Sequence, residues 1–314
     1  MLLVTGASGA LGSLVAERLT GRADVLLGTR NPSTAIGAGA RGPSAAIGAG
    51  TRRVDFDDPR TLPGAFTGVD TLLLVSAGYG EDDTVAARHG AAIEAAERTG
   101  VRHLVYTSLS GDGDHLPYAL AHRWTERRLR ESGLAWTVLR NGLYAELLAA
   151  LAAPGPDGRI TAPLGEGRLA AVTRADLAEA AVRVALDPAP HTGRVYELVG
   201  ETALGGTDLA AALSTPGAPV RYEPTTLAAA RAALIASGTA APFQVQMLTG
   251  TYSAIAHGFL AGDGLPGERD TGGRGDLRRL LGRAPRPAVE AYAEAVRAGA
   301  VRAGAVRGEA ASVG

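Results

Sequence analysis

The sequence predicts an α/β fold: a Rossmann-type, doubly wound parallel sheet with a small, discontinuous C-terminal lobe. Short β-rich runs alternate with Ala-rich stretches of helical length through the first half of the chain, a pattern typical of βαβ units. Runs such as LLLVS and HLVYTS are almost entirely apolar, as expected for strands that helices cover on both faces of a sheet. A glycine-rich turn directly follows the first run, and this third feature favours the same fold.

The expected elements follow from these runs. Strands are expected at 2–5, 24–28, 52–55, 71–76, 103–108, 136–140 and 194–199. Helices are expected near 11–19, 84–99 and 118–132. Right-handed crossovers would join the strands into one parallel sheet, with a ligand site at their carboxyl ends.

The alternation breaks after Arg140, and a loop rich in Pro and Gly follows at 154–158. We therefore expect three regions. They are a nucleotide-binding core at 1–142 with 173–200 returning to it, a substrate-binding lobe at 143–172 and 200–290, and a flexible tail at 291–314. Two short repeats, at 33–54 and 295–309, are too short for solenoid units. We expect them to form a loop and part of the tail.

The composition excludes several classes of protein. Of the 314 residues 46% are hydrophobic, while the net charge of -1 gives no electrostatic reason to bind nucleic acid or a membrane surface. The chain has no cysteine and no lysine, so all 31 basic residues are arginines and disulfides are excluded. The histidines lack metal-ligand spacing, so no metal is expected. No signal peptide or apolar run of about 20 residues is found, which favours the cytoplasm; a homo-oligomer is possible.

The segment TGASGALG at 5–12 follows the first strand and opens a helix. Gly6, Gly9 and Gly12 have the GxxGxxG spacing, in which glycines permit a tight turn, close approach of the backbone to a pyrophosphate, and close packing of helix on strand. Free N–H groups and the dipole at the helix N-terminus favour the phosphates. The motif predicts a dinucleotide site, to which Ser8, Ala10 and Leu11 also belong.

The second expected strand ends in VLLGTRNP, which carries no acidic residue. An Asp or Glu there would bind the ribose 2′-hydroxyl of NAD. Arg30 stands in the next turn instead, and a guanidinium suits the 2′-phosphate because its forked donors bind two phosphate oxygens. The sequence therefore predicts NADPH (NADP) in preference to NAD.

The ends of the third and fourth expected strands provide further candidates for cofactor binding. Asp55 would accept a hydrogen bond from the adenine amino group, and Phe56 would flank the ring. Ser76, Ala77 and Gly78 are small, so the central part of the cofactor would approach the backbone there.

Together these segments resemble the atypical short-chain dehydrogenase/reductases, in their NmrA-like branch, and within it the NAD(P)H:quinone oxidoreductases of type 2. The resemblance rests on TGASGALG, TRNP at 29–32, VYTSLSG at 105–111 and TERRLRESG at 125–133. LRNGLYAE at 139–146, TRADLAEAA at 173–181 and DLRRLLGRAPR at 276–286 extend it over nearly the whole chain. It implies a Rossmann core, NADPH, and a small lobe that closes over the nicotinamide.

The resemblance also places the segment YALAH at 118–122. The superfamily carries YxxxK here, so Tyr118 takes the position of the catalytic tyrosine and His122 takes that of the lysine. Thr107 and Ser108 stand where a hydroxyl usually orients the substrate. These four residues are the catalytic candidates, and His122 is also expected to contact the cofactor.

Other candidates follow from the same resemblance or from their aromatic character. Asn141 and Gly142 lie in the stretch that the family places beside the nicotinamide. Tyr144 and Tyr79 are candidates for contact with the substrate, and Trp124 is a further candidate for the lining of an aromatic pocket.

The exchange of lysine for histidine decides which reaction is expected. A histidine with an ordinary pKa of about 6.5 is mostly neutral near pH 7, so it would hold a ribose hydroxyl but lower the pKa of a neighbouring phenol less than an ammonium group does. Acceptors whose reduction needs little general acid catalysis are therefore favoured. The sequence predicts an NADPH-dependent oxidoreductase that acts on a quinone or a conjugated polycyclic aromatic ketone. The alternatives are a ketoreductase that tailors an aromatic polyketide and a non-catalytic, NADP-binding redox sensor.

Overall fold

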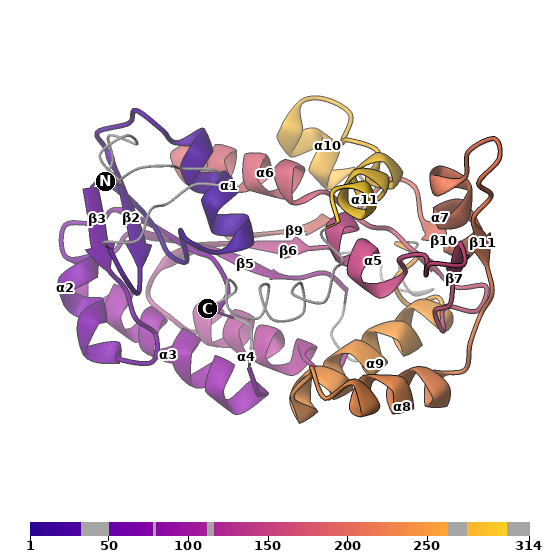
Figure 1. Cartoon of the computed structure of the whole chain (residues 1–314). Coiled ribbons are helices and arrows are strands. Elements are labelled where there is room, and N and C mark those ends of the chain that lie inside the picture. The colour runs from indigo at the N-terminus through magenta and orange to yellow at the C-terminus, as the bar shows by residue number, and fades with distance from the viewer. Residues whose placement is uncertain (33–49, 78–79, 112–115, 263–274, 300–314) are drawn as a thin grey trace.

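The computed structural model describes residues 1–32, 50–77, 80–111, 116–262 and 275–299. Its centre is a parallel sheet of seven strands in the order β3-β2-β1-β4-β5-β6-β9 (Figure 1). The strands are β1 (Leu2–Val4), β2 (Val25–Thr29), β3 (Gly50–Arg53), β4 (Thr71–Leu74), β5 (His103–Leu109), β6 (Ala135–Asn141) and β9 (Arg194–Leu198). All seven expected strands are present with bounds within two residues of those expected.

Helices cover both faces of the sheet. One face carries α1 (Ala10–Arg18), α6 (Arg174–Leu186) and α10 (Asp276–Leu281), and the other carries α2 (Leu62–Phe66), α3 (Asp82–Thr99) and α4 (Ala119–Arg130) (Figure 1). Two short 3₁₀ turns are η2 (Pro59–Thr61) and η3 (Ala189–His191). The predicted helices are confirmed as α1, α3 and α4, so the chain has the doubly wound fold that the sequence predicts.

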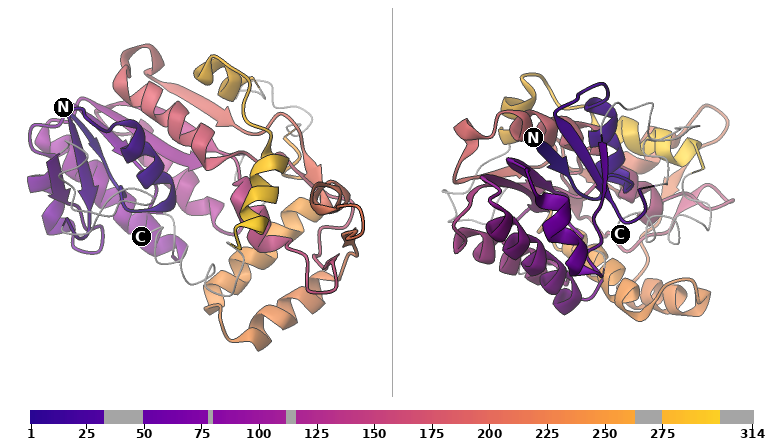
Figure 2. Two further views of the ribbon diagram at one scale, coloured as in Figure 1. Left: turned by 45° about the horizontal axis from the view of Figure 1, so that its top comes forward. Right: turned by 90° about the vertical axis from the view of Figure 1, so that its left-hand side faces the viewer.

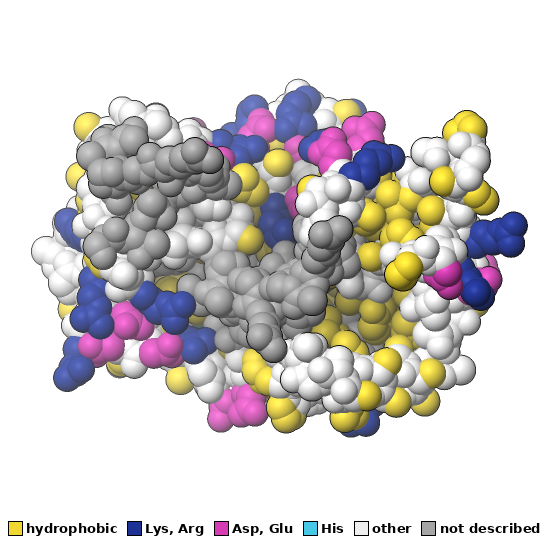
Figure 3. All heavy atoms as spheres, viewed as in Figure 1, with side chains coloured by type: hydrophobic (Ala, Val, Ile, Leu, Met, Phe, Trp, Pro, Cys, Tyr) yellow, Lys and Arg dark blue, Asp and Glu magenta, His cyan; other side chains and the backbone are white. Residues whose placement is uncertain are grey.

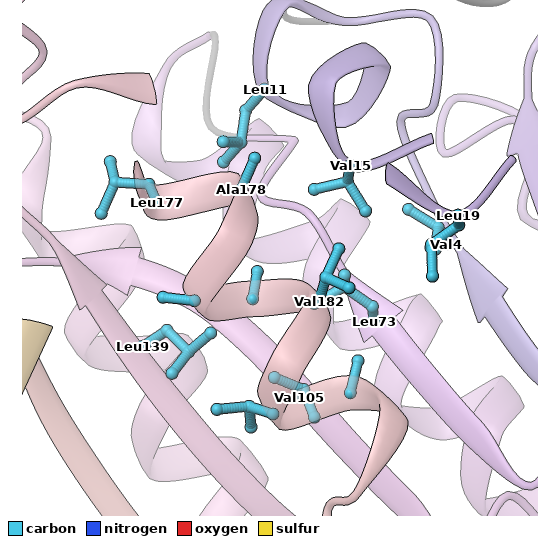
Figure 4. Close-up of a cluster of buried hydrophobic side chains, with 14 of the residues drawn as sticks. Val4, Leu11, Val15, Leu19, Leu73, Val105, Leu139, Leu177, Ala178 and Val182 are labelled. Atoms are coloured by element: carbon cyan, nitrogen blue, oxygen red, sulfur yellow. The ribbon is translucent and has the colours of Figure 1, made fainter. Parts of the chain in front are cut away.

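One core cluster lies between the sheet and the layer of α1 and α6. Leu11, Val15 and Leu19 face α6, and β-strand residues such as Leu73 and Val105 lie beneath it (Figure 4). These side chains are almost completely buried, and burial of apolar side chains is the main stabilising contribution to folding. The cluster fixes the N-terminus of α1 over the carboxyl ends of the strands.

The rest of the chain forms a second region with its own apolar cluster. Its helices are α5 (Ala145–Leu151), α7 (Gly206–Leu213), α8 (Leu227–Ser237), α9 (Pro242–Ala256) and α11 (Ala288–Arg297). Its short strands are β7 (Arg159–Ile160), β8 (Arg168–Leu169), β10 (Leu204–Gly205) and β11 (Arg221–Tyr222), paired as β7 with β11 and β8 with β10. Figure 2 shows α8 and α9, in orange, at the end of the molecule away from β2 and β3.

The structure differs from expectation at the C-terminus. The tail expected at 291–314 begins with ordered helix, because α11 extends to Arg297 and its Tyr292 is fully buried and donates a hydrogen bond to the Ala152 carbonyl at 2.7 Å. Residues 300–314 lie outside the described residues. Helix α10, expected in the lobe, instead packs through Leu277 and Leu281 into the core beside α6.

Two other expectations concern segments that are only partly described. Of the first repeat, 33–49 lie outside the described residues, and the following residues form β3. In the described ranges, none of the helices combines the length and the apolar character that crossing a membrane requires.

Candidate active site

A cavity of about 230 Å³ opens at the carboxyl ends of the central strands, between them and helix α9. It brings together most of the predicted site residues. These are Gly6, Gly9, Ala10, Leu11, Gly12, Phe56, Ser76, Ala77, Thr107, Ser108, Tyr118, His122, Asn141, Gly142 and Tyr144. Segments more than 100 residues apart in the sequence therefore meet in one place, which is the edge where open α/β sheets bind ligands.

The glycine turn forms one end of the cavity. Gly6 has a φ of +61°, a conformation that favours glycine, and Gly9 precedes the first turn of α1 without a capping side chain. A Cβ atom on Gly12 would lie 1.9 Å from the carbonyl oxygen of Gly6, so only glycine fits. The turn thus presents bare backbone at the N-terminus of α1, as a pyrophosphate requires.

The amide of Asn141 gives a second test of the fit. Its Oδ1 atom is buried at the cavity wall and accepts no hydrogen bond within the part of the chain that the structure describes. A buried acceptor without a donor is costly. The carboxamide N–H of a nicotinamide ring would satisfy it, so the residues present fit a nicotinamide dinucleotide.

Some predicted cofactor residues lie outside the cavity. Ser8 is exposed, and its hydroxyl lies 3.2 Å from that of Thr29. Arg30 is exposed just after the end of β2. The carboxylate of Asp55 pairs with Arg53 at 3.3 Å and accepts a backbone N–H. Gly78, a predicted cofactor residue, and Tyr79, a predicted substrate residue, lie outside the described residues.

Tyr118 lines the cavity from the start of α4. Its hydroxyl lies 3.0 Å from Oγ1 of Thr251, on α9. The Thr251 hydroxyl donates to the Met247 carbonyl at 2.9 Å, so the phenol is the donor in the pair. Burial raises the pKa of Tyr118 to about 12. The phenol is therefore a weak acid whose proton is directed at Thr251.

His122 occupies the position one helical turn further along α4 and is only 8% exposed. Its Nδ1 atom lies 2.8 Å from the hydroxyl of Tyr106. Burial, with a smaller contribution from the charge of Arg123, lowers the pKa of His122 to about 4. The side chain is accordingly neutral near pH 7, so the cavity has no cation at this position.

The hydroxyls of Thr107 and Ser108, on β5, are already hydrogen-bonded. Thr107 accepts the backbone N–H of Ser76 at 2.9 Å, and Ser108 donates to the carboxylate of Glu126 at 2.7 Å. Glu126 is fully buried and takes two further hydrogen bonds from Arg140, at 2.9 and 2.8 Å. Burial alone would raise the pKa of Glu126, but Arg140 and Arg123 outweigh it and the pKa is lowered. The ionised carboxylate thus holds the Ser108 proton away from the cavity.

The sequence analysis missed eight residues that line the cavity. From the core they are Val75, Leu109 and Arg174, and from the segments that follow β6 they are Leu143, Leu147, Met247, Leu248 and Thr251. Met247 and Thr251 are four residues apart on α9 and so share a face, but no motif marks that helix. Arg174 lies with its guanidinium 4.5 Å from the centre of the Tyr144 ring, a cation–π distance.

Helix α9 approaches the core closely at one point. A Cβ atom on Gly250 would lie 2.2 Å from Cγ of Pro117, so glycine is needed for this contact. Pro117 directly precedes Tyr118, and Gly250 directly precedes Thr251. Trp124 does not reach the cavity: it is 40% exposed and packs against Gly90 of α3. Hydrophobic side chains gather around α5 and α9 on the face shown in Figure 3.

A dinucleotide fits the glycine turn and Asn141, and a small apolar molecule fits the chamber beside Tyr144 and α9. The fold and the cavity thus define a Rossmann-type nucleotide-binding protein. More closely, the chain belongs to the NAD(P)H-binding family, whose model matches residues 6–188.

Known proteins similar to the chain include several reductases. It is 38% identical over 229 residues to quinone oxidoreductase 2 of Escherichia coli (strain K12), which covers 71% of this chain and 77% of that protein. It is 33% identical over 245 residues to NAD(P)H azoreductase of Xenophilus azovorans, covering 76% and 82%. The crystal structure of an NADPH-dependent quinone oxidoreductase from Escherichia coli with NADPH matches with a TM-score of 0.77 and 32% identity, over 94% of this chain and 99% of that one.

Proposed function

We propose that the protein is an NADPH-dependent oxidoreductase that transfers hydride to a quinone or to a related conjugated aromatic acceptor. One observation carries the proposal: an apolar chamber adjoins the nucleotide end of the cavity, and neither Tyr118 nor His122 is arranged as a strong acid there. The relatives named for quinone and azo reduction support the same chemistry.

The reaction balances without an acidic side chain. NADPH, when bound, would supply a hydride, which is two electrons and one proton, and would be released as NADP⁺. A quinone that gains this hydride becomes a hydroquinone anion, whose charge is spread over the ring. A proton from water completes the product. A simple ketone would form an alkoxide instead, which needs a positioned donor.

Each part of the chain has a defined task in this reaction. The turn at Gly6–Gly12 binds the pyrophosphate, Asn141 accepts from the nicotinamide carboxamide, and His122 hydrogen-bonds a ribose hydroxyl. Tyr144 and Leu248 flank the acceptor. The second apolar cluster, built on α5, α7, α9 and α11, serves as the substrate-binding lobe. A cytoplasmic location and a homo-oligomer stay predictions.

The test is NADPH oxidation by the purified protein, followed by absorbance. Simple quinones form one set of acceptors and polycyclic aromatic ketones the other. Turnover of quinones is expected. Turnover of ketones alone would replace this proposal with that of a ketoreductase, and tight NADPH binding without turnover of either set would favour a redox sensor.

Replacing Tyr118 with phenylalanine is expected to change kcat with a quinone by less than about threefold, because the phenol donates its hydrogen bond to Thr251. A general acid would normally contribute about 100-fold or more. Steady-state rates measure this. Tyr252→Phe is the matched control, since Tyr252 lies on α9 but donates to the Leu151 carbonyl. A 100-fold loss in Tyr118→Phe alone would instead make Tyr118 the proton donor.

Replacing Arg30 with glutamate is expected to raise KM for NADPH about tenfold or more and to leave KM for NADH almost unchanged. The physical reason is that the guanidinium binds a 2′-phosphate that NADH lacks. Arg22→Glu, at the amino end of β2, makes the same charge change away from the site. Equal effects of Arg30→Glu on both cofactors would contradict the assignment.

A further inference from the structure

Behind the cavity wall, four buried side chains form one hydrogen-bonded group. They come from three elements: His89 from α3, Tyr106 from β5, and His122 and Thr125 from α4. His89, Tyr106 and Thr125 are completely buried. Of the four, His122 is the one that lines the cavity.

The hydrogen bonds determine which nitrogen of His89 carries a proton. The backbone N–H of Ala77 can only donate, and it lies 3.0 Å from Nε2 of His89. Nε2 is therefore the acceptor, and the proton is on Nδ1. Nδ1 lies 2.8 Å from Oγ1 of Thr125, which in turn donates to the Ala121 carbonyl at 2.7 Å. His89 thus accepts the Ala77 N–H on Nε2 and donates from Nδ1 to Thr125.

This direction extends to Tyr106. Its hydroxyl oxygen lies 3.4 Å from Nδ1 of His89, which already bears a proton, and 2.8 Å from Nδ1 of His122. Ser76 and Thr125 also interact with this hydroxyl, but Nδ1 of His122 is its shortest contact, and we assign the Tyr106 proton to it. Nδ1 of His122 is then an acceptor, and in the neutral ring the proton is on Nε2. Burial also lowers the pKa of His89, to about 3, which keeps that ring neutral.

We propose that His89 and Tyr106 are positioning residues that hold His122 in its Nε2–H tautomer, so that it donates a hydrogen bond to a ribose hydroxyl oxygen of the cofactor. The role toward the cofactor rests on the proposed function, whereas the tautomer does not. Two histidines whose ring centres lie 6.4 Å apart would carry opposite tautomers. The Nε2–H tautomer of His122 supplies the N–H that a lysine ammonium would otherwise provide.

Nitrogen-15 NMR of the histidine side chains, in the protein without cofactor, tests the tautomers. His89 is expected as Nδ1–H and His122 as Nε2–H, with assignments from His89→Gln and His122→Gln. Tyr106→Phe should shift the His122 signals toward a mixture of tautomers. The signals of His103, which pairs with Thr137 at 2.9 Å, should stay unchanged. An Nδ1–H form of His122 in the natural protein would overturn the proposal.

NADPH affinity tests the consequence. His122→Gln keeps an N–H at the place of Nε2, whereas His122→Asn offers one at the place of Nδ1. The Gln variant should retain affinity within about threefold, and the Asn variant should lose about tenfold or more, with matched thermal unfolding of both. Equal losses would overturn the donor role. If the natural protein binds no NADPH at all, the proposed function fails while the NMR result still decides the tautomer.

Discussion

Replacing Gly12 with alanine is expected to weaken NADPH binding by at least about tenfold. The new Cβ atom would lie 1.9 Å from the Gly6 carbonyl oxygen and 2.7 Å from its carbon, so the turn and α1 must separate. Overpacking of this kind costs about 1–3 kcal/mol, and each 1.4 kcal/mol is about a tenfold change in affinity. The displaced backbone would no longer face the pyrophosphate.

Fluorescence titration with NADPH measures the loss of affinity. Urea unfolding shows how much of that loss reflects destabilisation of the whole fold. Gly64→Ala is the matched control, because it lies in helix α2 and a Cβ atom there meets nothing within 4 Å. It should bind NADPH as the natural protein does. If Gly12→Ala bound with unchanged affinity, the turn would not be the pyrophosphate site.

Replacing Glu126 with glutamine should lower the free energy of unfolding by about 3 kcal/mol, as expected when one partner of a buried ion pair is removed. Glu126 is fully buried, and Arg140 beside it is only 6% exposed. The amide keeps the shape but not the charge, so Arg140 would rely on Glu197 alone. Ser108 would also lose its carboxylate acceptor.

The measurement is urea unfolding near pH 7. Glu223→Gln is the control, since Glu223 pairs with Arg159 at 3.0 Å and both side chains are about half exposed. A surface pair of this kind contributes about 1 kcal/mol or less. Similar changes in the two variants would show that the buried group is not a stability determinant.

The sequence was sufficient where the determinants are local. The turn at Gly6–Gly12 could be predicted because its glycines, the strand before it and the helix after it are contiguous. The same holds for the apolar strands, and the resemblance to quinone oxidoreductases of type 2 is confirmed by the relatives. The role of each site residue stays a prediction.

The sequence was insufficient where partners are distant. Thr251 pairs with Tyr118 across 133 residues, and the direction of that hydrogen bond depends on the Met247 carbonyl, which no motif reveals. The tail was misjudged for a different reason. Val289, Tyr292 and Val296 have helical spacing, but the Ala- and Gly-rich repeat that follows concealed it.

The histidine in the cavity has a chemical consequence beyond hydrogen bonding. A buried lysine ammonium there would be in equilibrium with its free amine, which is nucleophilic and able to add covalently to the electron-poor ring of a quinone. Nδ1 of His122 instead lies 2.8 Å from the Tyr106 hydroxyl, and the chain has no lysine or cysteine anywhere. A reductase of quinones built in this way offers its substrates neither a thiol nor a lysine amine to alkylate.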